Sequence, residues 1–164
     1  MAKYNETILT PNDNELTITR VFDAPRELLW KAFTTKESLT QWWGPKGWTL
    51  PVCEIDFRVG GEWFYCMAGP NGEQSCGVAV FKEISAPERF VNTDSFADDK
   101  GNVNESMPTT TITNEFVDLG NGQSKLVSHA RYDSAEQLKM VLEMGMGEGI
   151  RQTWDRLDDL VATA

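Results

Sequence analysis

Residues 15–45 read ELTITRVFDAPRELLWKAFTTKESLTQWWGP, and the hydrophobic period changes partway along this stretch. Residues 15–22 alternate between two faces and are rich in β-branched side chains, which predicts a first strand. After Pro25, apolar side chains recur at helical spacing as far as Phe33, and proline fits the first turn of a helix. A strand followed directly by a helix is therefore expected.

A second, short helix is predicted to follow at once. Thr34 and Glu37 form a capping box, in which side chains bond the free backbone amides of the first turn. Gly44 suits the C-terminal cap of this helix, and Pro45 cannot continue it. The chain therefore leaves the helical region at this point.

The centre of the chain, from residue 47 to about residue 132, reads as strands and turns. Turn signals at GG, GPNGE, APE, DDKGN and LGNGQ separate apolar runs of strand length. These runs give about six further strands, and their short connections predict antiparallel pairing.

The C-terminal region is predicted to be helical. Ser134 and Gln137 form another capping box. The sequence GMGEG at residues 145–149 favours a break before a long final helix, and the alternative is a glycine face that lets the helix backbone approach the sheet or a ligand closely. In that helix apolar residues recur at steps of four, three and four, at Ile150, Trp154, Leu157 and Val161. The element order predicts an α+β fold with helices on one face of a twisted antiparallel sheet. A hollow is expected between the sheet and the long helix.

Composition limits the classes of partner and location. The 164 residues include 25 acidic and 15 basic ones, and the net charge of -10 disfavours nucleic acid and membrane surfaces as partners. No apolar run reaches the length of a membrane span, and the first residues are too polar for a signal peptide. We expect a cytoplasmic protein with a flexible segment at 1–13 and one domain at 14–164.

The three cysteines, Cys53, Cys66 and Cys76, lack the spacing of a zinc site, so reduced thiols are expected. Symmetrical pairing of the strands around Asn71 would place Cys66 opposite Cys76. A redox or metal role for that pair is the less favoured alternative. No metal and no cofactor are predicted.

Several stretches of the chain resemble signature stretches of one superfamily, in order ITRVFDAPRELLWKAFTTKESLTQWWGP, IDFRVGGEWFYCMAGPNGE, GVAVFKEISAPERFVNTDSFADDKGN and GEGIRQTWDRLDDLV. This is the SRPBCC or helix-grip superfamily, which includes START lipid-transfer domains, Bet v 1-like proteins and polyketide cyclases. The chain is most similar to its bacterial branch related to the activator of Hsp90 ATPase homologue 1, over residues 14–162.

The resemblance implies a curved seven-stranded antiparallel sheet that wraps around a long C-terminal helix, with two short helices between strands 1 and 2. It also implies an apolar cavity between sheet and helix. The bacterial members of this branch mostly stand alone, and we expect the same here, without the separate N-terminal domain that accompanies the Hsp90-activating region; an interaction with Hsp90 is therefore not favoured. One such fold hosts carriers, cyclases and interaction modules, so fold alone does not assign an activity.

Aromatic and methionine side chains are the main candidates for lining the cavity, because they offer large and adaptable contact area. The alternative is that they fill an ordinary core. The candidate ligand-binding residues are Trp42, Trp43, Trp48, Phe57, Trp63, Tyr65, Met67, Asp94, Phe96, Met144 and Trp154. The stretch TQWWGPKGW, residues 40–48, is predicted to form the rim of the cavity, because a loop is a poor place to store core volume. At least one of its three tryptophans should face the cavity, and packing of another beneath the helices is the alternative left open.

Asp94 is the most promising polar feature of the site. It shares strand parity with Phe90 and Phe96, which points it inward. A buried carboxylate needs a partner, such as Arg131, or a raised pKa. If the side chain of Asp94 instead points outward, it is an ordinary surface carboxylate.

Other acid-base groups are less promising, and no catalytic residue is assigned. Alternation along KLVSHARY places His129, the only histidine, on the solvent side. Asp56, Arg58 and Glu62 read as a structural polar cluster beside a turn. Nucleophile-elbow, zinc-protease and phosphate-loop motifs are absent from the sequence.

The leading hypothesis is a binding module that holds a small hydrophobic molecule, aromatic or lipid-like, in the cavity. The first alternative is a cyclase or hydrolase that acts on an aromatic or polyketide-like substrate by positioning it. The second is a protein-interaction module, either a chaperone cofactor or a homodimer, that uses exposed aromatic residues.

Overall fold

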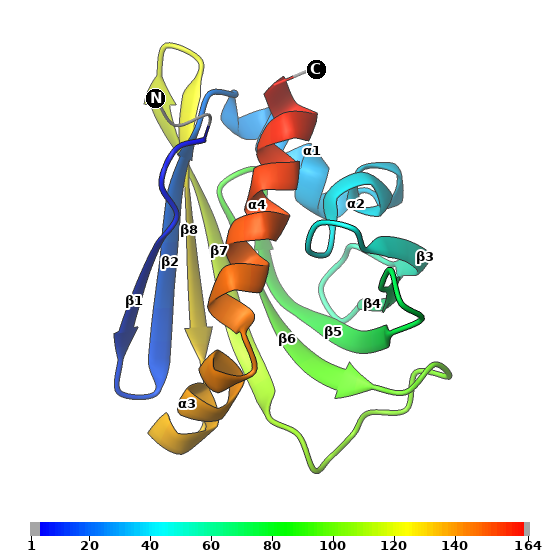
Figure 1. Ribbon diagram of the computed structural model, residues 1–164. Coiled ribbons are helices and arrows are strands. Elements are labelled where there is room, and N and C mark those ends of the chain that lie inside the picture. Colours follow the sequence, from blue (N-terminus) through cyan, green and yellow to red (C-terminus); the bar gives the residue numbers. More distant parts are fainter. Residues whose placement is uncertain (1–3, 163–164) are drawn as a thin grey trace.

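The computed structural model describes residues 4–162 and consists of one curved antiparallel sheet with four helices (Figure 1). The strands are β1 (Ile8–Asn12), β2 (Glu15–Phe22), β3 (Thr49–Ile55), β4 (Glu62–Ala68), β5 (Gln74–Ser85), β6 (Arg89–Ala97), β7 (Thr109–Gly120) and β8 (Gln123–Arg131). The helices are α1 (Arg26–Thr34), α2 (Lys36–Trp42), α3 (Ala135–Glu143) and α4 (Met146–Ala162). The predicted α+β class is confirmed.

The sheet has eight strands rather than the expected seven. The additional strand is β1, which pairs with β2 and lies inside the segment predicted to be flexible, residues 1–13. Its sequence, ILTPN, gives a weak strand signal because it contains Pro11. An edge strand tolerates proline, since one side of its backbone has no sheet partner. Because of β1, helices α1 and α2 lie between the second and third strands.

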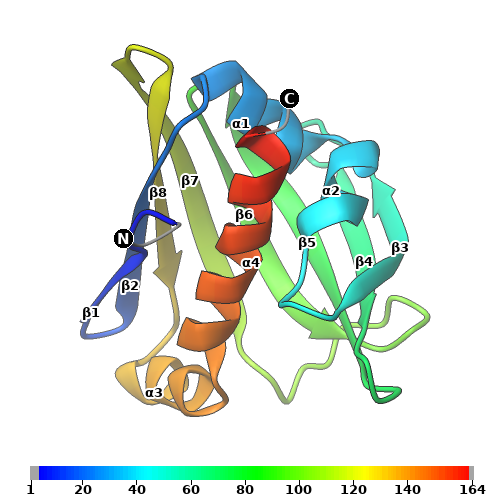
Figure 2. The ribbon, with the colours of Figure 1, turned by 45° about the horizontal axis from the view of Figure 1, so that its top comes forward.

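The strand order is β1-β2-β8-β7-β6-β5-β4-β3, so only the β2–β8 pair joins strands that are distant in the chain. Helix α4 runs across the inner face of the curved sheet, with α1 and α2 beside it (Figures 1 and 2). This helix buries Trp154, Leu157 and Val161 of the predicted apolar stripe. The C-terminal helix therefore forms the centre of the core.

Helix α4 is also joined to β2 by a buried arginine. Arg20 shares the inward face of β2 with Leu16 and Ile18, although it is charged. Its guanidinium donates hydrogen bonds to Asp155 at 2.7 Å and to Asp158 at 2.8 Å. Two partners satisfy the charge that burial would otherwise leave isolated.

The predicted break in the C-terminal helical region is confirmed. Helix α3 ends at Glu143, and Gly145 has φ of +93°, a conformation that side-chain-bearing residues rarely adopt. Gly147 and Gly149 lie inside the first turns of α4. One glycine therefore makes the break.

The helix caps differ slightly from the expected positions. Thr35, not Thr34, caps α2 and accepts a hydrogen bond from the amide of Ser38. Ser134 caps α3 as predicted, accepting from the amide of Gln137. Within residues 4–162, no helix combines the length and the apolar character needed to cross a membrane.

Candidate ligand-binding pocket

A pocket of about 460 Å³ lies between the inner face of the sheet and the α3–α4 region. Strands β4 to β8 supply its floor, and the loop after α2 and the first turns of α4 supply its walls. Among the candidate residues named from the sequence, those that line it are Trp43, Trp63, Tyr65, Met67, Asp94, Phe96, Met144 and Trp154.

Three aromatic rings form one wall. Trp43 contacts Trp63 edge-on, with ring centroids 4.7 Å apart, and its centroid lies 5.7 Å from that of Tyr65. Trp63 and Tyr65 lie on the same face of β4, two residues apart, with centroids 4.6 Å apart. The end of α2 and strand β4 thus build an aromatic surface together.

The three tryptophans of the TQWWGPKGW loop have different roles. Trp43 is half-buried and lines the pocket, as predicted for the rim. Trp42 is fully buried in the core, and its indole donates a hydrogen bond to the carbonyl of Ala32 at 2.9 Å. Trp48 is half-buried but does not line the pocket. The prediction that placed all three at the ligand was therefore wrong for Trp42 and Trp48.

Phe57 is also outside the pocket lining. It packs edge-on against Trp30, Phe81 and Phe90, with centroid distances of 5.6, 4.9 and 5.5 Å. It follows the end of β3, where the alternation of the strand no longer sets its direction. Phe57 therefore belongs to the packed aromatic core beside the pocket.

Arg156 of α4 holds the tryptophan loop in place. Its guanidinium donates to the carbonyls of Gln41, Gly44, Pro45 and Trp48, at 3.0, 2.8, 3.3 and 3.1 Å. Burial lowers the pKa of Arg156. Sequence reasoning missed this residue, because its partners are backbone atoms more than 100 positions away.

The polar centre of the pocket is the pair formed by Asp94 and Tyr65. The tyrosine hydroxyl lies 3.1 and 3.2 Å from the two carboxylate oxygens and donates its hydrogen to them. Burial raises the pKa of Asp94 to about 7, although hydrogen bonds from Tyr65 and from the amide of Ser95 oppose the shift. Burial, together with the nearby Asp94, raises the pKa of Tyr65 well above its ordinary value.

The inward position predicted for Asp94 is confirmed, but the suggested partner is wrong. Arg131 is exposed at the end of β8, and Tyr65 takes its place beside the carboxylate. The error has a physical reason, because Arg131 alternates with the inward-facing Ala130 and so points to the other side of the sheet.

Gly77 of β5 provides the space that the pair needs. Tyr65 lies opposite Gly77 in the β4–β5 register, and Asp94 lies opposite Ala79 in the β5–β6 register. A Cβ atom at Gly77 would be 2.5 Å from the tyrosine hydroxyl oxygen. The tyrosine can therefore cross β5 only because position 77 has no side chain.

Further polar side chains of the lining were not singled out from the sequence. They include five uncharged side chains from β6, β7, β8 and the residue just after β8: Asn92, Thr110, Asn114, Ser128 and Tyr132. Strand alternation could have predicted their inward position, because each lies two residues from an inward-facing residue and therefore on the same face of the sheet. The hydroxyl of Tyr132 donates to the sulfur of Met146 at 3.5 Å, which links β8 to α4.

The remaining acid-base candidates lie away from the pocket. His129 is on the outer face, 3.4 Å from Glu115, as the alternation predicted. Asp56 and Arg58 form an exposed ion pair of 2.8 Å, which agrees with the structural interpretation. Across residues 4–162, no cluster of three or more metal-binding side chains occurs.

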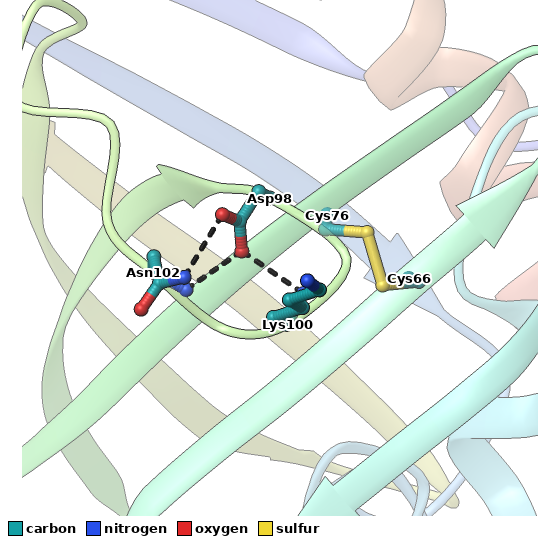
Figure 3. The surroundings of a disulfide bond; sticks show 5 residues. All are labelled: Cys66, Cys76, Asp98, Lys100 and Asn102. Carbon is teal, nitrogen blue, oxygen red and sulfur yellow. Dashed lines mark hydrogen bonds between the residues drawn. A yellow bond between two sulfur atoms is a disulfide. The ribbon is translucent and has the colours of Figure 1, made fainter.

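Two cysteines form a disulfide, contrary to the expectation of reduced thiols. Cys66 and Cys76 are opposite each other in the β4–β5 register, as symmetrical pairing about Asn71 predicts, and their sulfurs are bonded. The bond lies beside the turn after β6, where the carboxylate of Asp98 accepts from the amides of Lys100 and Asn102 (Figure 3). Cys76 lines the pocket. Two buried cysteines facing each other on paired strands are close enough to bond. The expectation of reduced thiols rested on the absence of zinc-site spacing, which does not exclude a bond between facing cysteines.

Comparisons with known proteins agree with this architecture. A family model described as Activator of Hsp90 ATPase homolog 1-like protein matches residues 23–162. The crystal structure of protein Ms6760 from Mycobacterium smegmatis is 31% identical with a TM-score of 0.87, over 95% of this chain and 97% of that one. A solution structure of a protein from Arthrobacter aurescens is 28% identical with a TM-score of 0.85, over 96% and 92%. No curated protein matches the chain.

Proposed function

The chain belongs to the family of Activator of Hsp90 ATPase homolog 1-like proteins, and we propose that it binds a small hydrophobic molecule in the pocket. The resemblance to the helix-grip superfamily implies an apolar cavity between sheet and helix, which supports this proposal. The pocket itself is the observation that carries the proposal. Its volume of about 460 Å³ is in the range of small-molecule sites, roughly 300–1,000 Å³.

The composition of the lining supports an apolar ligand. Nine of the lining residues are aromatic: Phe33, Trp43, Trp63, Tyr65, Phe81, Phe90, Phe96, Tyr132 and Trp154. Methionines 67, 144 and 146 add flexible apolar contact. Removing apolar surface from water contributes about 25 cal/mol per Å² to binding, and a few polar groups then fix the orientation.

A pocket-filling variant tests the proposal. Ile112 of β7 lines the pocket and is only half-buried, so an Ile112→Trp side chain would occupy the space of a ligand. We expect tryptophan-fluorescence titration with phenylbutanol to show binding to the wild type and affinity reduced about tenfold or more in the variant. Val117→Trp is the matched control, because Val117 lies on the same strand but is exposed outside the lining.

Native mass spectrometry of freshly purified protein is a second test. A copurified hydrophobic molecule that is lost in Ile112→Trp but kept in Val117→Trp would support the proposal. Absence of binding by phenylbutanol and by a broader set of apolar compounds to folded wild-type protein would overturn it.

The position of Asp94 favours a second candidate, an enzyme that uses this carboxyl as an acid or base. A group with a pKa near neutral pH is suited to proton transfer. Neither His129 nor Arg131 lines the pocket, so this mechanism depends on Asp94 alone among the three groups considered. Prolonged incubation with the copurified ligand distinguishes the two functions: an unchanged ligand supports a carrier, whereas conversion that stops in Asp94→Asn supports an enzyme.

A further inference from the structure

We propose that the ligand of this pocket is a hydrophobic amine, whose ammonium group binds the carboxylate of Asp94. The inference rests on the proposed function, because it assigns the chemistry of the molecule held in the same pocket. The observation that carries it is a charge without a counter-charge: among residues 4–162, Asp94 is the only charged side chain in the pocket lining.

The part of the chain that the structure describes places no cation beside Asp94 in the pocket. Within residues 4–162, no lysine, arginine or histidine contributes to the pocket lining. An ionised carboxylate in apolar surroundings is unfavourable unless a positive partner or several donors compensate for the lost water. A ligand ammonium would provide that partner. The net charge of -10 on the whole chain also favours the approach of cations over anions.

The carboxylate has acceptor capacity left for a ligand. Its two oxygens offer about four acceptor positions. Tyr65 provides one hydrogen, placed between both oxygens, and the amide of Ser95 provides another. An ammonium group has donors only, so it complements the positions that remain, and such charge-assisted hydrogen bonds are the stronger kind.

The walls suit a cation with an apolar body. The rings of Trp43, Trp63 and Tyr65 pack together on one side of the pocket. From this side the hydroxyl of Tyr65 reaches Asp94. Aromatic faces attract cations, and the attraction is stronger where water is excluded. On the α4 side, Ile150 and Trp154 provide apolar surface for the hydrocarbon part. A carboxylate ligand would instead meet a like charge.

This assignment predicts how binding depends on pH. Asp94 is largely protonated below its pKa of about 7, so ammonium binding must release a proton there and is strongest once the carboxylate is ionised. The titratable groups facing Asp94 are Tyr65 and Tyr132, and both have pKa values raised above 10. The other lining residues from β5, β7, α3 and α4 are uncharged. Amine affinity should therefore rise between about pH 6 and pH 8.

Three ligands with one skeleton test the proposal on the wild-type protein: phenylbutylamine, phenylbutanol and phenylbutyrate. At pH 8, tryptophan-fluorescence titration should show that the amine binds about tenfold more tightly than the alcohol, and that the carboxylate binds most weakly. Calorimetry near pH 6.5, in buffers of different ionisation enthalpy, should detect proton release with the amine and not with the alcohol.

Asp94→Asn should remove the preference for the amine, so that amine and alcohol bind the variant with affinities within about threefold of each other. Asp99→Asn is the control, since it removes one exposed negative charge and should keep the preference. Circular dichroism checks that both variants fold, and the pH series on the wild type tests the proposal independently of them. Binding of the alcohol as tightly as the amine at pH 8 would overturn this inference and leave the proposed function intact, whereas absence of binding by all three would overturn both.

Discussion

The hydroxyl of Tyr65 reaches the carboxylate of Asp94 across an intervening strand, at 3.1 and 3.2 Å from its two oxygens. Tyr65 lies on β4 and Asp94 on β6, with β5 between them. The contact is possible because Gly77 leaves the space above β5 open. A single glycine thus sets the geometry of the polar centre of the pocket.

Gly77→Ala should disrupt this pair. The added methyl would meet the tyrosine hydroxyl and ring at 2.5–3.0 Å, so Tyr65 must move. We expect a loss of about 1–3 kcal/mol in the free energy of unfolding, measured by urea denaturation, as for other overpacked sites. Gly149→Ala is the comparison, because its new methyl would lie 3.8 Å from Pro45 inside a helix. That variant should be unchanged or more stable by up to about 1 kcal/mol.

Asp94→Asn should stabilise the protein more at high pH than at low pH. The pKa of Asp94 is about 7 in the folded protein and near 3.8 when unfolded, so ionisation of the folded state is unfavourable. The stability that the protonated carboxyl gives is fully present below about pH 4 and is lost as pH rises through about 7.

The free energy of unfolding of Asp94→Asn minus that of the wild type should therefore be about 1–3 kcal/mol larger at pH 8 than at pH 5. Urea denaturation at both pH values measures this difference. The titration of the other carboxylates contributes equally to both proteins and cancels in this difference. An equal difference at the two pH values would contradict a raised pKa of Asp94.

Arg20→Met should destabilise the junction between β2 and α4. The change leaves Asp155 and Asp158 close together without their shared cation. We expect a loss of roughly 3 kcal/mol in the free energy of unfolding, because Asp158 loses its cation and Asp155 keeps the longer contact of 3.9 Å to Lys46. Arg131→Met, on the exposed end of the neighbouring strand, should change stability by less than about 0.5 kcal/mol.

Arg156→Met should loosen the loop that carries Trp43 and Pro45. The variant loses all the hydrogen bonds from the guanidinium to the loop carbonyls, which we expect to cost about 1–3 kcal/mol. Hydrogen exchange of the backbone amides of residues 41–48 should become faster than in the wild type. The rate at which phenylbutanol dissociates should also increase. Arg151→Met is the matched control, because Arg151 lies on the same helix and forms a surface ion pair with Glu148. Unaltered exchange in Arg156→Met would rule out this role.

The features predicted well from the sequence depend on residues close together in the chain. The helical spacing of Trp154, Leu157 and Val161 required α4 to be amphipathic, and the glycines near residue 145 required a break before it. Strand parity placed Asp94 inside and His129 outside. The resemblance to the helix-grip proteins is confirmed by the family match over residues 23–162.

The sequence therefore determined the fold class, the position of the helices and the face on which most residues lie, because period and turn chemistry are local properties. Only the tertiary structure decided that Trp43 lines the pocket while Trp42 is core, that Arg156 holds their loop, and that Cys66 bonds to Cys76. It also decided that Tyr65, rather than Arg131, accompanies Asp94. These relationships join residues from different strands and helices, and their distances depend on the register and curvature of the whole sheet, which no local pattern records.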